Sequence, residues 1–125
     1  MQLFIFDSDI IIDYLRGFEG ALEFFESFDY DFNTSVVTIA ELYSGVRDKD
    51  RQELEYFMSL FAVLPLTTEI AKVAAFLRQS YFKSHGMGLA DAMIAATAKA
   101  HGATLVSLNA CHFSMLDNVL VPYSK

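Results

Sequence analysis

Three acidic side chains and one amide stand where they could together hold a divalent metal ion. Each lies at the end of an expected strand or in the first turn of an expected helix: Asp7, Glu41, Asp91 and Asn109. Mg²⁺ and Mn²⁺ prefer oxygen ligands and keep several water molecules. An ion held in this way lowers the pKa of a bound water and stabilises charge on a phosphodiester. The four residues therefore suit metal-dependent hydrolysis of phosphodiesters.

Most of the acids also have a structural role open to them. Thr38 and Glu41 have the spacing of a capping box, in which Glu41 reaches back to the Thr38 amide. Asp91 could complement a helix N-terminus, and Asp9 suits the N-cap of the first helix. Asp7 is harder to explain structurally, because it directly ends a buried apolar strand. The order of the acids along the chain, more than any one of them, indicates a shared site.

The elements that must position these residues alternate along the chain. Strands are expected over 4–6, 32–37, 63–66, 104–108 and 119–121. Helices are expected over 9–15, 20–28, 38–46, 51–61, 69–82 and 89–100. This alternation predicts one α/β domain over 1–125, a three-layer α/β/α sandwich with a central, mostly parallel sheet. Pro65, inside the third strand, predicts either an edge strand or a strand end. Ligands of such sheets gather at the carboxyl ends of the strands, where the acids are expected.

Composition narrows the function classes. The net charge of −7 argues against a conventional nucleic-acid binder with a basic patch. A bound metal ion would offset part of this charge, and a basic partner could cover the rest. Cys111 is the only cysteine, which excludes an internal disulfide and leaves only a remote role as a nucleophile activated by His112. The histidines fit no zinc motif and are expected on the surface or in loops: His85, His101 and His112.

Two further features concern location and partners. The N-terminus lacks the features of a signal peptide and the apolar runs are too short to span a bilayer, so we expect a cytoplasmic protein without membrane contact. Twelve Phe and six Tyr are many for 125 residues. They predict either a Phe-rich core or surplus apolar surface for a dimer or a partner helix, and the sequence leaves both open.

Four sequence blocks resemble the PIN-domain family, especially its VapC-type toxins, and they occur in the family's order. The blocks are Phe4–Asp9 with Ile10–Gly17, Ser35–Leu42 with Gly45–Val46, Leu89–Ala98, and Leu105–Asn109 with His112–Phe113. The resemblance implies a PIN-like fold and a Mg²⁺- or Mn²⁺-dependent endoribonuclease. Its reaction would be hydrolysis by a metal-activated water, leaving a 5′-phosphate and a 3′-hydroxyl.

The resemblance also implies roles for individual residues. Asp7 and Asp91 would bind the metal directly, and Glu41 would bind it directly or through water. Asn109 stands where many members carry a fourth acid, and its amide weakens the case for a second tightly held ion. Ser107 would orient the ligands through its hydroxyl.

Two charged residues keep alternative roles. Asp9 falls where members often carry Asn or Ser, and it would either add charge to the site or only cap the helix. Arg16 is the nearest basic residue for a phosphate contact, although a solvated helix-end charge is an equally simple interpretation.

The implied partners are RNA, a cognate antitoxin and a second copy of the chain in a homodimer. The stretch Phe24–Tyr30 would line a groove for the antitoxin, or it is simply a core helix. Two other functions are considered: a non-catalytic PIN-fold interaction module, and a haloacid-dehalogenase-type phosphatase with Asp7 as nucleophile. The phosphatase also needs a lysine and a late acidic pair, and the sequence places neither suitably.

Overall fold

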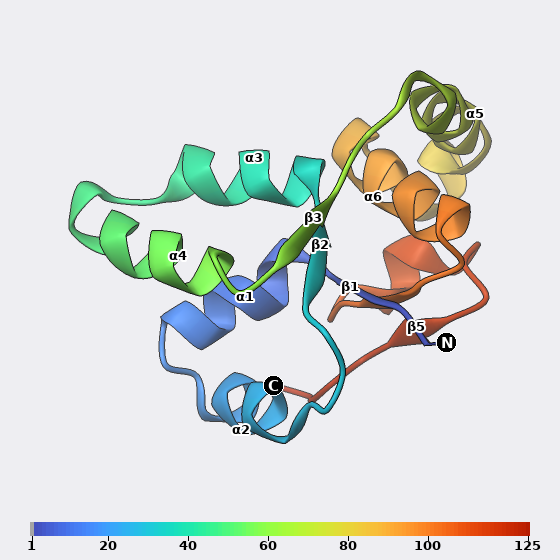
Figure 1. Ribbon diagram of the computed structural model, residues 1–125. Coiled ribbons are helices and arrows are strands. Elements are labelled where there is room, and N and C mark those ends of the chain that lie inside the picture. The colour runs from blue at the N-terminus through green and yellow to red at the C-terminus, as the bar shows by residue number, and fades with distance from the viewer. Residues whose placement is uncertain (1) are drawn as a thin grey trace.

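The computed structural model describes residues 2–125, apart from the side chain of His85, and contains a five-stranded sheet. Its strands are β1 (Phe4–Phe6), β2 (Asn33–Ser35), β3 (Ala62–Leu64), β4 (Thr104–Val106) and β5 (Val119–Leu120). They are ordered β3-β2-β1-β4-β5, and every neighbouring pair is parallel (Figure 1). The predicted parallel sheet is confirmed. β3 is an edge strand and ends at Leu64, directly before Pro65, so both outcomes that this proline predicted are observed.

Helices connect the strands and cover both faces of the sheet (Figure 1). The α-helices are α1 (Ser8–Leu15), α2 (Glu19–Ser27), α3 (Val36–Gly45), α4 (Arg51–Met58), α5 (Thr68–His85) and α6 (Leu89–Ala100). Two short 3₁₀ helices are η1 (Asp48–Asp50) and η2 (Ala110–Phe113). No helix in the described part of the chain is long and apolar enough to cross a membrane.

Alternating side chains of the central strands divide the core into two clusters. Ile5 and Leu105 face a cluster with α5 and α6, whereas Phe6 and Val106 face a cluster with α1, α2 and α4. This alternation follows from the pleat of a strand, in which successive side chains point to opposite faces. The register pairs Ile5 with Leu105 and Phe6 with Val106, so both strands present the same face at each level. The predicted three-layer α/β/α arrangement is thereby confirmed.

Most of the phenylalanines pack inside the second cluster. The Phe6 ring is fully buried and lies 5.0–6.0 Å from the centroids of five others: Phe24, Phe25, Phe28, Phe32 and Phe61. Edge-to-face and offset packing of this kind is the favoured geometry for aromatic rings. The rings of the stretch Phe24–Tyr30 therefore belong mainly to the core, which decides between its two predicted roles. Tyr30, half exposed, is the exception.

Replacing Phe6 with Ala should destabilise the protein by about 3–5 kcal/mol, because it removes the ring at the centre of this cluster and leaves a cavity. The matched control is Phe76→Ala, because Phe76 is 64% exposed on α5. That change should stay within about 0.5 kcal/mol. Urea unfolding followed by circular dichroism measures both. Equal losses for the two variants would contradict the assigned core.

Candidate metal centre

Asp7 is placed by the pairing of β1 with β4. β1 ends at Phe6, and the Asp7 backbone N–H donates to the Val106 carbonyl at 2.9 Å, which continues the ladder by one residue. The Asp7 side chain is 5% exposed. Its Oδ1 accepts a hydrogen bond from the Ser8 N–H at 2.8 Å, and its Oδ2 accepts one from the Ser107 hydroxyl at 2.8 Å. The carboxylate is thus fixed at the carboxyl end of the sheet.

Asp9 joins the start of α1 to the segment after β4. Its Oδ2 accepts a hydrogen bond from the Leu108 N–H at 2.9 Å and a longer one, 3.4 Å, from the Ser107 hydroxyl. Its Oδ1 accepts from the Ile10 N–H at 2.8 Å. The predicted N-cap role of Asp9 is wrong, because α1 already begins at Ser8 and the capping position falls to Asp7. Of its two predicted roles, adding charge beside Asp7 is therefore the one left open.

Glu41 is not part of a capping box. α3 begins at Val36, two residues earlier than expected, and its N-cap is Ser35. The Ser35 hydroxyl oxygen accepts the Thr38 N–H at 3.0 Å and contacts the Thr38 hydroxyl at 2.9 Å. Since the Thr38 N–H already has a partner, Glu41 is not needed there. Glu41 Oε1 is instead buried without a hydrogen-bond partner.

Asp91 lies in the first turn of α6, as expected, and contacts a histidine. The side chain of His112 reaches it from η2, with 3.3 Å between His112 Nδ1 and Asp91 Oδ2. From the sequence, His112 was expected in a loop or on the surface, with activation of Cys111 as its only other role, and its contact with Asp91 was not predicted. Cys111 is exposed and free.

Ser107 and Asn109 follow β4 directly, at the carboxyl end of the sheet where Asp7 also lies. Ser107 is fully buried, whereas Asn109 is exposed. The Asn109 backbone N–H donates to the Ser107 hydroxyl oxygen at 3.0 Å, and that hydroxyl donates to Asp7. The Asn109 backbone therefore helps to hold the serine that holds Asp7.

Burial and the charges of neighbouring carboxylates raise the pKa values of Asp7, Asp9 and Glu41. Burial is the main cause of the raised pKa of Asp7, which the Ser107 hydrogen bond partly opposes and the charge of Asp91 increases. Burial followed by the charge of Asp7 raises the pKa of Asp9 to about 6. Burial and then the charge of Asp7 raise the pKa of Glu41; a hydrogen bond with Ser8 partly opposes this rise, and the charge of Asp91 adds to it. Asp7, Glu41 and Asp91 thus act on one another in a single electrostatic field.

This arrangement fits a divalent cation in its chemistry. Glu41 Oε1 is buried and unpartnered, which is costly unless a ligand binds it. A cation would also relieve the repulsion that raises the pKa values. Among the described side chains, however, no three His, Cys, Asp or Glu groups already stand in a metal-binding arrangement. An ion bound here would have to draw the carboxylates together.

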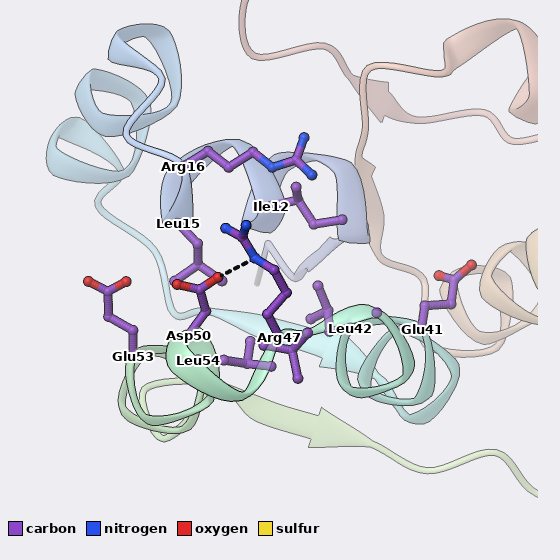
Figure 2. A pocket seen from close by; sticks show the side chains of 11 residues that line it. Ile12, Leu15, Arg16, Glu41, Leu42, Arg47, Asp50, Glu53 and Leu54 are labelled. Carbon is purple, nitrogen blue, oxygen red and sulfur yellow. Dashed lines mark hydrogen bonds and ion pairs between the residues drawn. The ribbon is translucent and has the colours of Figure 1, made fainter.

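A groove of about 560 Å³ runs from Glu41 along α1 towards η1 and α4 (Figure 2). Arg16 projects from the end of α1 and Arg47 from the opposite wall. Arg47 Nε donates to Asp50 Oδ2 at 3.0 Å, and Glu53 lies beyond Asp50 at the end away from Glu41. The groove therefore combines two guanidinium groups with carboxylates at both ends.

The PIN domain family model matches residues 4–114. The chain belongs to the PIN domain family. Ribonuclease VapC10 of Mycobacterium tuberculosis is 36% identical over 125 residues, which cover 98% of this chain and 94% of the relative. Ribonuclease VapC19 of the same organism is 32% identical, with 95% of this chain and 98% of the relative covered. The resemblance to VapC-type PIN proteins is confirmed.

Solved structures agree with this assignment. A chain of a toxin-antitoxin complex from Klebsiella pneumoniae superimposes with a TM-score of 0.84 at 27% identity, covering 99% of this chain and all of that one. A chain of FitAcB from Neisseria gonorrhoeae does so with a TM-score of 0.79 at 30% identity, covering 96% of this chain and 98% of that one. PIN-domain ribonucleases generally depend on divalent metal ions.

Replacing Asp9 with Asn should stabilise the metal-free protein relative to the wild type as the pH rises from about 4 to about 7. The pKa of Asp9 is about 6 in the folded chain and 3.8 as its ordinary value. Between these values the folded state still holds a proton that the unfolded state has released, so the wild type loses stability as the pH rises. The difference corresponds to at most about 3 kcal/mol.

Urea unfolding in EDTA at several pH values tests this. The control is Asp29→Asn, because Asp29 is an exposed acid in the segment before β2. The Asp29 variant, which also removes one carboxylate, is compared with the Asp9 variant at every pH. A constant difference between the Asp9 variant and the wild type across this range would contradict the raised pKa.

Proposed function

We propose that this PIN-domain protein is a divalent-metal-dependent endoribonuclease, using Mg²⁺ or Mn²⁺, and the toxin of a toxin–antitoxin pair. The observation that carries the proposal is the group of mutually repelling, partly buried carboxylates at the carboxyl end of the sheet, with one buried oxygen of Glu41 unpartnered. The names of the relatives, ribonucleases VapC10 and VapC19, support RNA as the substrate. The toxin-antitoxin complex among the structural neighbours supports the partner.

In this mechanism Asp7, Asp91 and Glu41 would hold the ion. When bound, it would supply an activated water and charge stabilisation at the phosphodiester. Ser107 and the Ser8 N–H fix the two oxygens of Asp7, so this carboxylate keeps its orientation when substrate arrives. Asp9 adds negative charge next to Asp7 and secures the segment after β4. Hydrolysis by water would leave a 5′-phosphate and a 3′-hydroxyl.

The groove beside the acids supports a path for the RNA strand or for an antitoxin segment. Arg16 and Arg47 suit phosphate contacts, whereas the carboxylates Glu41, Asp50 and Glu53 suit a basic side chain of an antitoxin. The net charge of −7 favours a basic partner segment in the same way. The proposal includes a cytoplasmic location, because a ribonuclease toxin acts where the RNA is. The homodimer stays a prediction.

Asp91→Asn should abolish cleavage of RNA, because an amide binds a divalent ion more weakly than a carboxylate. With purified protein, total RNA and Mn²⁺, we expect the wild type to cleave and the variant to lose at least about 100-fold in rate. EDTA should stop the wild type. Asp29→Asn, a change to an exposed acid, should leave the rate unchanged. Gel analysis with 5′-end mapping identifies the products.

Cleavage of equal rate by the wild type and the Asp91 variant would contradict the assigned site. Absence of both cleavage and Mn²⁺ binding, in a protein that still binds a basic partner, would favour the non-catalytic interaction module instead. The two outcomes are separated by a Mn²⁺ titration of the same samples.

Arg16→Ala should lower kcat/KM for RNA by about 10- to 100-fold if its guanidinium contacts a phosphate, since hydrogen bonds to charged groups contribute about 1.5–3 kcal/mol. Arg51→Ala is the matched control, because Arg51 is exposed at the start of α4 and does not line the groove. Initial rates on a short synthetic RNA measure both. Equal rates for the Arg16 variant and the wild type would leave Arg16 a solvated helix-end charge.

A further inference from the structure

We propose that His112 supplies an imidazole nitrogen to the metal centre, so that the ion is held by a mixed set of carboxylates and one histidine. This inference rests on the metal site of the proposed function and names a further ligand of it. It also names the class of ion that the site prefers, which is a divalent transition metal such as Mn²⁺ over Mg²⁺.

The position of His112 is fixed by the packing of its neighbour. Phe113 is fully buried in the core cluster that contains α5 and α6. The His112 backbone N–H donates to the Asn109 carbonyl at 3.0 Å, which closes the turn of η2. With the backbone held on both sides, the imidazole lies over the first turn of α6, where Asp91 stands. Its approach to Asp91 is therefore a property of the fold rather than of a mobile loop.

The distance between the two side chains suits two ligands of one ion. His112 Nδ1 lies 3.3 Å from Asp91 Oδ2. Adjacent ligands of an octahedral ion with bonds of about 2.1 Å lie about 3 Å apart. The spacing of these two atoms therefore matches that of neighbouring ligands, and an ion bound here would still have to draw the other carboxylates closer. Burial raises the pKa of Asp7, and the charge of His112 is the smallest of the effects that oppose this rise, so the imidazole lies within electrostatic reach of Asp7 as well as in contact with Asp91.

An ion pair between His112 and Asp91 that served only stability would explain the position of His112 less well. The two side chains are 40% and 30% exposed, and ion pairs with this much solvent contribute little to stability. Asn109, at the position implied for a fourth acid, is exposed, and its backbone serves Ser107. His112, three residues further on, contacts Asp91 instead. A fourth protein ligand of this centre is thus offered by a histidine.

A nitrogen ligand changes which metal the site prefers. Imidazole suits transition metals, whereas Mg²⁺ favours sites made of carboxylates and water. Loss of His112 should therefore lower the affinity for Mn²⁺ by at least about tenfold and lower that for Mg²⁺ less. If His112 only oriented Asp91, its removal would lower the affinities for Mn²⁺ and Mg²⁺ by similar factors. The ratio of the two affinities therefore distinguishes a direct ligand from an orienting residue.

The experiment measures Mn²⁺ binding to tag-free, full-length protein by electron paramagnetic resonance. Titration of the free-ion signal gives the affinity, competition with Mg²⁺ gives the affinity ratio, and pulsed measurements detect a directly bonded ¹⁴N nucleus. The variants are His112→Ala and His112→Asn; the second keeps a hydrogen-bond donor for Asp91 but offers no imidazole. His101→Ala is the matched control, because His101 is exposed at the end of α6. Urea unfolding in EDTA confirms that each variant is folded.

We expect ¹⁴N coupling in the wild type and in the His101 variant, and its loss in both His112 variants. Mn²⁺ bound in an Asp7-dependent way without ¹⁴N coupling would overturn the assignment of His112 and leave the proposed function standing. Loss of the coupling in the His101 variant would also overturn it. No Mn²⁺ binding by the wild type would overturn the proposed function together with this inference.

Discussion

The parallel pairing of β1 with β4 is the contact on which the candidate metal centre depends. It joins segments about a hundred residues apart in sequence and continues past Phe6, where the Asp7 N–H donates to Val106. The same step brings the Ser107 hydroxyl onto Asp7. Because Phe6 and Val106 are fully buried, the pairing is anchored by the core on one side and carries the acids at its carboxyl end. Any loss of register here would separate the acids from the serine.

Placing these carboxylates together destabilises the metal-free protein electrostatically. Burial raises the pKa values of Asp7, Asp9 and Glu41, and the charge of Asp7 raises those of Asp9 and Glu41 further. An apolar or neutral set of side chains would be more stable without metal. The aromatic cluster around Phe6 and the Ala-rich packing of α6 supply the stability that such a site consumes. A bound cation would relieve this repulsion, and the free energy released would contribute to the affinity for the metal.

Much of this protein follows from patterns in its sequence. Apolar strands alternating with helices indicated the parallel three-layer fold, and Pro65 indicated the edge strand, because a proline cannot serve a central ladder. The four blocks indicated the PIN family. The convergence of Asp7, Glu41 and Asp91 was also foreseeable, because the carboxyl ends of parallel strands lie along one edge of the sheet. Their role in binding metal remains a proposal.

Residue types and their local periodicity were enough to predict the order of the elements and the identity of the acids, because both are local properties of the chain. Only the folded chain shows that Ser35, rather than Thr38, caps α3, which leaves Glu41 without a capping role. The folded chain also shows that Asp9 accepts a hydrogen bond from the Leu108 N–H. It further shows that the packing of Phe113 places His112 against Asp91. In each case the local sequence offers more than one possible hydrogen-bond or contact partner. Contacts between segments distant in sequence select the partner, because they determine which donor and acceptor come within hydrogen-bond distance.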